Sequence, residues 1–561
     1  MRILLLLLTF VFTSHSLSAQ VLNSKSYKNG LVVTADKYAS EVGKEILQKG
    51  GNAVDAAVAV QFALAVTLPR AGNIGGGGFM VIHLADGETA TLDFREKAPQ
   101  KATRDMYIRN GEFDGDLSWE GILAVGVPGT VDGMIKASER YGRLPLDMVM
   151  QPAIKLAREG YLLSYSHAQD LNNHKDTFIK YRASRDYFTT GDSTLFEEGD
   201  LFVQEDLATT LQRVARFGRE GFYAGPTADA IVAEMERYRG LITHSDLYDY
   251  ESVWRDPVTV DYKGYSLHIM PPPSSGSVAI AQILKMVNDY DLKSMGHNSA
   301  DYVHVLAEAM RRSFADRSYY LGDPDFVNIP MEELTSEYYN DVRMGDFSMD
   351  SATASSSISH GEISGYTEPS ETTHFSVMDV DGNAVSVTTT LNGSFGSHVS
   401  VSGAGFLLNN EMDDFSAQPG EPNTYGLIGA EANAIEPGKR MLSSMSPTIV
   451  TKNGKVDMIL GAAGGPRIIT ATLQTFLNRA VFDMRAQQAT SLPRFHHQWL
   501  PDVLLFDDFG LSPDTQKLLE EKGHRIFPYP AVGRAHNIYV GSDGSLTGGV
   551  DPRGDGHASG Y

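Results

Sequence analysis

The sequence predicts a layered α/β domain in which long apolar helices cover sheets built from hairpins. Three observations support this class. Several segments alternate like strands around a polar or glycine-containing turn, apolar residues recur at helical spacing between them, and the chain shows no internal repeat and no long linker. One large domain is therefore the expected organisation, although 561 residues would allow about two to four by length alone.

The chain begins with a segment typical of export. Arg2 precedes an apolar run from Ile3 to Phe12, and small residues end at Ala19. This run is shorter than the roughly 20 residues that span a bilayer, so residues 1–19 are predicted to be a signal peptide, with no membrane anchor. The absence of cysteine excludes disulfides and thiol chemistry, and a net charge of −23 argues against nucleic acid as a partner. We expect an exported protein, periplasmic or secreted.

Two helices are expected from their caps and apolar spacing. Asn52 is a suitable N-cap for a helix through Val66. Ser299 is suited to cap a second helix, whose apolar positions are Val303, Leu306, Ala307, Met310 and Phe314.

Two hairpins are expected to bring functional side chains to strand ends. In Phe79–Arg95 the turn is Asp86-Gly87, a signal for a two-residue type I′ loop, and counting outward places Arg95 opposite Gly78. The arginine would thus lie beside the glycine run 75–78.

The hairpin that follows Ser443 turns at Asn453-Gly454. The same count places Ser443 opposite Gly464 and Ser444 opposite Ala463. Hydroxyls and small residues are therefore expected to meet at one strand end.

The most informative stretch begins at Thr372. It follows residues 349–371, a segment rich in Ser, Thr and Gly with no apolar period, which reads as accessible to cleavage. A cut before Thr372 would give a threonine whose free α-amine takes the proton from its own hydroxyl during attack on a carbonyl.

The register of this third hairpin decides which hydroxyl lies beside Thr372. Its turn contains Asp381-Gly382. An odd loop centred on Asp381 pairs Thr390 with Thr372, whereas a strict two-residue loop pairs Thr390 with Thr373. In both registers a second hydroxyl is close to Thr372.

A set of motifs closely resembles the γ-glutamyltranspeptidase family over nearly the whole mature chain. The motifs are GGNAVDAAVAV (50–60), GNIGGGGFM (72–80), DFREKAP (93–99), PPPSSG (271–276), LGDPDFV (321–327), TTHFSV (372–377), LLNNEMDDFS (407–416), LSSMSPTIV (442–450) and PRFHHQWLPD (493–502).

The resemblance implies a four-layer αββα sandwich of the N-terminal-nucleophile hydrolase type. It implies a precursor that cleaves itself between Glu371 and Thr372. The large subunit would be residues 20–371 and the small subunit residues 372–561, and the two would stay together as a heterodimer.

The resemblance also implies residue roles. Thr372 corresponds to the nucleophile and Thr390 to the residue that orients its hydroxyl. The substrate's glutamyl end carries a carboxylate and an ammonium, which need donors and acceptors respectively. The corresponding residues are Arg95, Ser443 and Ser444 for the carboxylate, Asn392, Glu411 and Asp414 for the ammonium, Gly464 and Gly465 for the oxyanion hole, and Tyr425 for a lid over the pocket.

The implied activity is release of the amine half of glutathione or a related γ-glutamyl compound, with transfer of the acyl group to water, an amino acid or a peptide. No cofactor and no metal are expected, and the adjacent His496 and His497 have poor geometry for sharing an ion. Two alternatives remain. A glutaryl (β-lactam side-chain) acylase on the same scaffold is disfavoured by retention of Glu411 and Asp414, and a non-catalytic exported γ-glutamyl-binding protein by Thr372 after a cleavable segment.

Overall fold

The computed structural model describes residues 25–191, 194–358, 372–418 and 429–561. Within this part, seven strands form one antiparallel sheet in the order β22-β2-β12-β13-β3-β4-β9. Their bounds are His557–Gly560, Leu31–Thr34, Thr373–Met378, Ala384–Thr390, Gly77–His83, Thr89–Asp93 and Val253–Arg255.

A second antiparallel sheet has the order β1-β21-β20-β15-β14-β11-β10, and β16 pairs with β20 at its side. The bounds are Ser26–Tyr27, Leu546–Val550, Arg534–Val540, Lys455–Leu460, Thr448–Lys452, Tyr265–Ile269 and Val258–Tyr262, with β16 at Ala462–Ala463.

The two sheets pack face to face between layers of helices. Along β2, Leu31 and Val33 belong to the core shared by the sheets, while Val32 belongs to the core under the helices, so both faces of the strand are buried. In the second sheet Ile449 packs between the sheets and Val450 against the other helices. The four-layer αββα prediction is confirmed.

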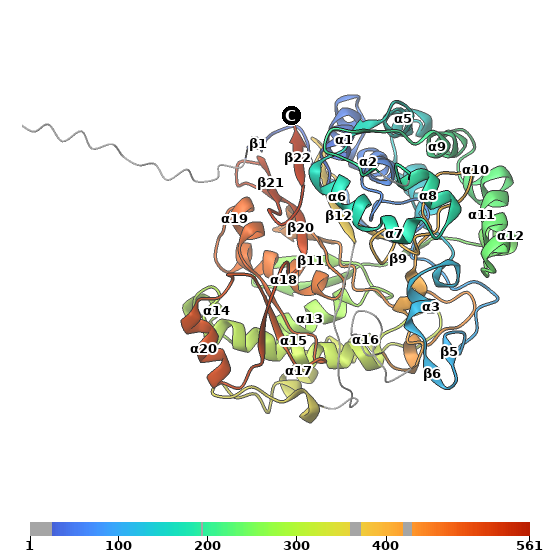
Figure 1. Cartoon of the computed structure of the whole chain (residues 1–561). Helices are drawn as coiled ribbons and strands as arrows, with labels where there is room; N and C mark the ends of the chain where they lie inside the picture. Colours follow the sequence, from blue (N-terminus) through green and yellow to red (C-terminus); the bar gives the residue numbers. More distant parts are fainter. Residues whose placement is uncertain (1–24, 192–193, 359–371, 419–428) are drawn as a thin grey trace, which may run out of the picture.

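The helices divide between the two outer faces (Figure 1). Those on the first sheet are α1 (Lys37–Gln48), α2 (Ala53–Thr67), α4 (Thr130–Tyr141), α5 (Leu146–Glu159) and α9 (Glu205–Phe217). Those on the second are α13 (Gly276–Met286), α15 (Ala300–Tyr320), α18 (Arg467–Ala480), α19 (Ala486–Ser491) and α20 (Pro513–Glu521). In the view, α1, α2 and α5 lie at the upper right, and α13 and α15 lie at the bottom.

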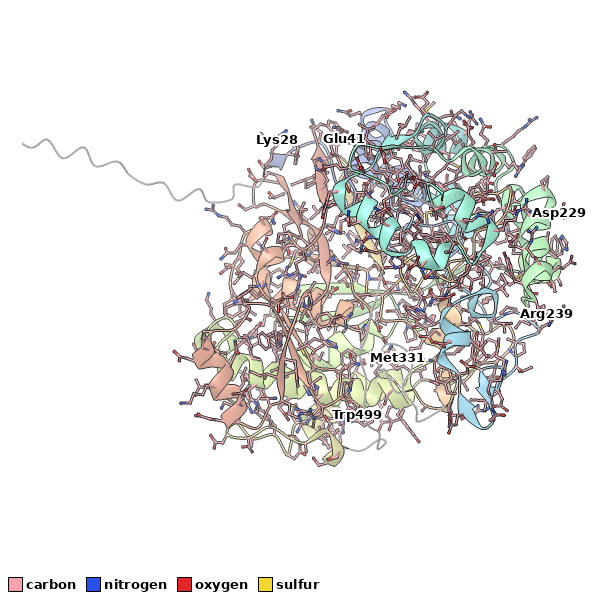
Figure 2. The ribbon with its side chains drawn as sticks, viewed as in Figure 1. Lys28, Glu41, Asp229, Arg239, Met331 and Trp499 are labelled. Carbon is pink, nitrogen blue, oxygen red and sulfur yellow. The ribbon has the colours of Figure 1, made fainter. Side chains whose placement is uncertain are left out.

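The other α-helices and strands surround these layers. They are α3 (Gly115–Trp119), α6 (Tyr165–Asn173), α7 (Lys175–Phe178), α8 (Arg182–Phe188), α10 (Glu220–Tyr223), α11 (Gly225–Tyr238), α12 (His244–Tyr248), α14 (Leu292–Met295), α16 (Met331–Leu334), α17 (Glu337–Arg343), β5 (Ile108–Arg109), β6 (Glu112–Phe113), β7 (Tyr161–Leu162), β8 (Leu201–Phe202), β17 (Phe495–His496), β18 (Leu504–Asp507) and β19 (Ile526–Tyr529). Asp229 and Arg239 lie at the periphery, whereas the Trp499 side chain is buried (Figure 2).

Both helix predictions are confirmed. Asn52 caps α2 and forms a capping box with Asp55, whose carboxylate accepts from the Asn52 N–H at 2.9 Å. Ser299 caps α15, and its hydroxyl accepts from the Tyr302 N–H at 3.2 Å. No helix among the described residues is long and apolar enough to cross a membrane.

The hairpin of β3 and β4 differs from the prediction by one residue. Phe79 pairs with Asp93, and Gly78 exchanges backbone hydrogen bonds with Phe94, so Arg95 is not opposite Gly78. The loop has three residues between Leu84 and Glu88, because only its glycine has a positive φ and a type I′ turn needs two such residues.

The hairpin of β14 and β15 begins as predicted and then shifts. Asn453 and Gly454 have φ values of 52° and 73°, as a type I′ turn requires. A β-bulge between Val450 and Thr451 then moves the register by one residue, and β14 starts only at Thr448. The predicted pairings of Ser443 with Gly464 and of Ser444 with Ala463 are therefore wrong; Ser443 bridges Ser274, and Ala463 pairs with Arg534.

The register of β12 and β13 matches the predicted alternative with an odd number of loop residues centred on Asp381. Thr373 pairs with Thr389 and Met378 with Ala384, which leaves a loop centred on Asp381. One step beyond the ladder, Thr372 is opposite Thr390.

Candidate active site

Thr372 lies immediately before β12 and lines a pocket. It is half-buried and directly follows residues 359–371, which are not described. Across the register stands Thr390, whose hydroxyl accepts from the Asn392 N–H at 2.7 Å. Both threonines line the same pocket, whose empty volume is about 540 Å³.

Most of the predicted site residues line this pocket, although they come from distant parts of the chain. They are Arg95, Thr372, Thr390, Asn392, Glu411, Asp414, Ser443, Ser444 and Gly465. Gly464 precedes a lining residue without lining the pocket itself. Glu371 and Tyr425 lie outside the described residues.

The Arg95 side chain makes several hydrogen bonds and ion pairs in the pocket. Its guanidinium is fully buried, ion-pairs with Glu411 and Asp414, and donates to the carbonyl oxygens of Met441 and Leu442 at 3.3 and 3.2 Å. Four of its five N–H donors are thus occupied without any substrate. The two carboxylates raise the pKa of Arg95, against the effect of burial.

The acids around Arg95 carry more negative charge than one cation balances. Burial raises the pKa of Glu411 well above its ordinary value and raises that of Asp414, with Arg95 opposing both shifts. Glu96, 3.6 Å from Arg95, has no hydrogen-bond partner for either carboxyl oxygen, and burial raises its pKa to about 8. Burial thus favours the neutral form of each of these three carboxyls, and Arg95 favours the charged form.

Ser443 and Ser444 also line the pocket. Ser443 is fixed by its backbone, which receives hydrogen bonds from the Ser275 N–H and hydroxyl, both at 2.7 Å. The Ser444 hydroxyl accepts from Arg317 at 3.1 Å, so its own proton remains available to donate.

Gly464 and Gly465 form a tight turn that leads into α18. Their φ values are 136° and 55°, in a region that side-chain-bearing residues rarely adopt. Within the described residues, neither N–H donates to a protein acceptor. The helix that begins at Arg467 adds the positive end of its dipole near these groups.

Comparison with known proteins identifies the family. The family model described as Gamma-glutamyltranspeptidase matches residues 39–561. This chain belongs to the γ-glutamyltranspeptidase family. It is 47% identical over 541 residues to the glutathione hydrolase proenzyme of Escherichia coli (strain K12), which covers 96% of this chain and 93% of that protein.

Solved structures of this family and of a related acylase have the same fold. The γ-glutamyltranspeptidase of Helicobacter pylori matches with a TM-score of 0.59 and 46% identity, over 60% of this chain and 96% of that one. The cephalosporin acylase of Bacillus halodurans matches with a TM-score of 0.86 and 27% identity, over 99% of both chains.

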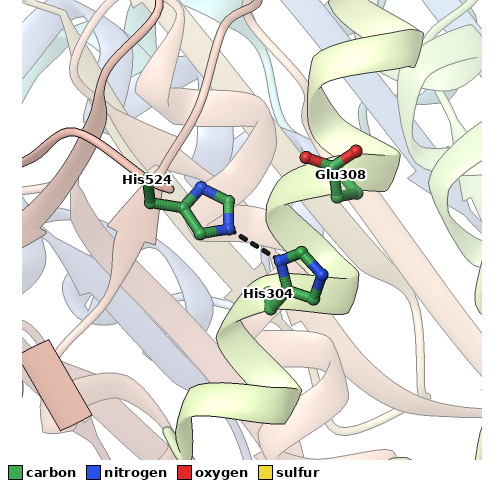
Figure 3. A group of neighbouring side chains, drawn as sticks. All are labelled: His304, Glu308 and His524. Atoms are coloured by element: carbon green, nitrogen blue, oxygen red, sulfur yellow. Dashed lines mark hydrogen bonds between the residues drawn. The ribbon is translucent and has the colours of Figure 1, made fainter. Parts of the chain in front are cut away.

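No histidine is among the described residues that line the pocket. His496 contacts Thr470 and Gln498, and His497 contacts Asp502. Among the described residues, the one His/Glu group close enough to hold an ion comprises His304, Glu308 and His524 (Figure 3).

This His/Glu group is arranged as a hydrogen-bonded cluster. The imidazoles of His304 and His524 are 2.7 Å apart, nitrogen to nitrogen, and the second nitrogen of His304 bonds to the Ser348 carbonyl. Both oxygens of Glu308 are already bonded, one to Arg311 and the other to Arg312. We therefore interpret it as a structural cluster.

Sequence reasoning missed Arg317 and Glu96 in this member of the family. Glu96 was read as part of a motif, but nothing indicated that its carboxyl lacks partners. A signal for Arg317 did exist. It lies three residues after Phe314, the last apolar position predicted for α15, so an arginine occupies the buried stripe of the helix.

Proposed function

We propose that this chain is a self-processing γ-glutamyltransferase that cleaves itself before Thr372 and then forms a γ-glutamyl ester on the Thr372 hydroxyl. The observation that carries the proposal is the position of Thr372 opposite Thr390, at the edge of a pocket holding a buried arginine and two acids. Among the described residues, the threonines that line this pocket are Thr372 and Thr390. Thr372 is the one that directly follows an undescribed segment.

Self-cleavage uses the hydroxyl before the amine is free. The Thr372 oxygen attacks the Glu371 carbonyl, the Glu371–Thr372 amide becomes an ester by an N-to-O shift, and water hydrolyses that ester. The products are a carboxylate at Glu371 and a free α-amine at Thr372. Thr390, held by the Asn392 N–H, orients the attacking hydroxyl.

The transfer reaction repeats this attack on a substrate. The Thr372 amine takes the proton from its hydroxyl, and the oxygen attacks the γ-amide carbonyl of the substrate. The N–H groups of Gly464 and Gly465 face the tetrahedral oxygen, and one such donor typically lowers the barrier by roughly 3 to 4 kcal/mol. The amine half leaves with the proton, and water or an acceptor amine then attacks the ester.

The pocket chemistry fits a γ-glutamyl group. Arg95, Ser443 and Ser444 supply a cation and hydroxyl donors for its α-carboxylate. Asn392, Glu411 and Asp414 supply acceptors for its α-ammonium, and Tyr425 would close the pocket as part of a lid. The name of the E. coli relative supports glutathione as the donor, and amino acids or peptides are the acceptors we propose beside water.

The proposed products are a large subunit of residues 20–371, after removal of the signal peptide 1–19, and a small subunit of residues 372–561. The solved H. pylori chain supports this division, because nearly its whole length matches only 60% of this chain. That share is close to the share expected of a large subunit. We propose that the protein is exported to the periplasm or medium.

The same pocket bears on the alternative activity, a glutaryl acylase. Glu411 and Asp414 both pair with Arg95, so they have a partner even when the substrate lacks an ammonium group. The comparison favours the transferase, since the acylase structure is only 27% identical and the E. coli glutathione hydrolase 47%. The binding-protein alternative requires a chain that stays uncut.

Intact mass and N-terminal sequencing of the purified wild type, of Thr372→Ala and of Thr373→Val test the proposal. The Thr373 hydroxyl is buried without a hydrogen-bond partner, so valine matches its shape and serves as the control. We expect a fragment that begins at Thr372 and turnover of a γ-glutamyl anilide in the wild type and in Thr373→Val only. An uncut, inactive wild type would overturn the proposal, and faster turnover of a glutaryl anilide would favour the acylase.

A further inference from the structure

Arg317 is a buried arginine of the pocket to which neither the motifs nor the comparisons assign a role. It lies on the last turn of α15, is 4% exposed and lines the pocket beside Ser444. Its Nε donates to the Ser275 hydroxyl at 2.9 Å and its Nη2 to the Ser444 hydroxyl at 3.1 Å.

Unlike the buried Arg312 and Arg494, Arg317 has no carboxylate partner among the described residues. Arg312 on the same helix ion-pairs with Glu308, and Arg494 ion-pairs with Asp551. Burial lowers the pKa of Arg317 to about 10, and the charge of Asp414 opposes that shift without direct contact. A buried cation that lacks an anion is costly unless an anion arrives during function.

The donor count separates Arg317 from Arg95. Arg95 already uses four of its five N–H donors on protein acceptors. Arg317 uses two, both on neutral hydroxyls, which leaves three without an acceptor among the described residues. Of these two cations, Arg317 therefore has more free donors for an anion in the pocket.

We propose that Arg317 is a second cation for the α-carboxylate of the γ-glutamyl group, acting beside Arg95 as a positioning and specificity residue. It acts through Ser444. Because the serine oxygen accepts a hydrogen bond from the guanidinium, the serine proton is directed to a different acceptor. A carboxylate is the acceptor that gains most from the nearby positive charge. Arg95 meanwhile holds the two acids that face the α-ammonium. This inference rests on the proposed function.

The test compares Arg317→Gln and Arg317→Lys with wild type, using the KM and kcat of a γ-glutamyl anilide. It also uses competitive inhibition by L-glutamate and by 4-aminobutyrate, which lacks the α-carboxylate. We expect Arg317→Gln to raise KM and the inhibition constant of L-glutamate about 10- to 100-fold, with a smaller change in kcat. The constant for 4-aminobutyrate should change less than about threefold, and lysine should recover part of the loss.

Arg312→Gln is the matched control, because it removes a buried arginine of the same helix that is paired outside the pocket. It should lower stability and leave the inhibition constant of L-glutamate unchanged. If Arg317→Gln does not fold or mature, Arg317→Lys provides the test. An unchanged KM of this variant for the γ-glutamyl anilide overturns the inference, and a rise of at least about threefold supports it.

Two results would overturn the inference while the proposed function stands. One is an unchanged inhibition constant for L-glutamate in Arg317→Gln, and the other is an equal rise for L-glutamate and 4-aminobutyrate, which indicates a structural role only. A wild type that neither cuts itself nor turns over the anilide would instead overturn the proposed function.

Discussion

At the residue scale, the proposed role of Arg95 in substrate recognition is linked to the stability of the fold. Its guanidinium is fully buried and neutralises the buried Glu411 and the partly buried Asp414, so its removal leaves two neighbouring carboxylates without their cation. Breaking a buried ion pair from one side typically destabilises a protein by about 3 to 5 kcal/mol.

We therefore expect Arg95→Gln to abolish γ-glutamyl anilide turnover and to lower the free energy of unfolding by about 3 kcal/mol. Urea unfolding in the Thr372→Ala background measures the loss on a single uncut chain. The control is Arg104→Gln, which breaks the exposed pair with Glu431 and should cost less than about 1 kcal/mol. Equal losses in the two variants would contradict the assigned role of Arg95.

The buried Glu96 carboxyl predicts how the stability of the fold depends on pH. Its folded-state pKa of about 8 lies above the ordinary value of 4.5, so between these values the folded chain holds a proton that the unfolded chain has released. This contribution to stability is fully present below about pH 4.5 and is lost as pH rises through about 8. Glu96→Gln removes the dependence, because glutamine is neutral in both states.

We expect Glu96→Gln to raise the free energy of unfolding at pH 7.5 by on the order of 1 to 3 kcal/mol and to change it little at pH 5. Urea unfolding at the two pH values, again in the uncut background, measures both. Glu139→Gln, at an exposed position, should change by less than about 0.5 kcal/mol at each pH. A Glu96→Gln variant that is less stable at pH 7.5 would show that the carboxyl is ionised there.

The candidate site shows which residues a sequence can disclose. Arg95, Glu411 and Asp414 were predicted through motifs, and the structure brings them into one pocket. Arg317 and Glu96 were missed because their importance lies in what they lack, a carboxylate partner and hydrogen-bond partners respectively. Missing partners depend on packing between distant segments, which no local pattern records.

At the element scale, the hairpins show why register is only partly predictable. Asn453-Gly454 forms the expected turn because both residues adopt positive φ, whereas Asp86-Gly87 provides one such residue and the loop grows by one. The bulge between Val450 and Thr451 has no glycine or other local signal, so the turn residues alone could not predict the register beyond it.

The segment before the cleavage site is another element with a testable role. Ser355 is buried, its hydroxyl donates to the Trp499 carbonyl at 2.6 Å, and its N–H donates to Asp502 at 2.8 Å. These bonds hold the last described residues before position 372 against a part of the chain that follows it, and so limit the positions that the cleavage segment can reach.

We expect Ser355→Ala to slow self-cleavage about two- to tenfold, because the start of the cleavage segment loses a buried hydrogen bond of about 1 to 2 kcal/mol. The fraction cut over time, followed by gel electrophoresis of freshly purified precursor, measures this rate. Ser357→Ala is the matched control two residues away, since that serine is exposed and its hydroxyl bonds only to Ala354. Equal rates for both variants would contradict the role of the segment.

At the scale of the whole molecule, the two proposed products are interleaved within both sheets. In the first sheet, β12 and β13 of the small product lie between β2 and β3 of the large one. In the second, β14 of the small product pairs with β11 of the large one. Neither product can leave without breaking central ladders and exposing the core between the sheets.

We therefore expect the cut protein to separate into its products only as it unfolds. Size-exclusion chromatography in increasing urea should show one complex up to the concentration at which the circular dichroism signal is lost. Because unfolding then also releases a partner, the midpoint should rise with protein concentration, with about 1.4 kcal/mol added per tenfold increase. Thr372→Ala, which stays one chain, should show no such dependence. Separation of folded products below the unfolding midpoint would contradict the interleaved architecture.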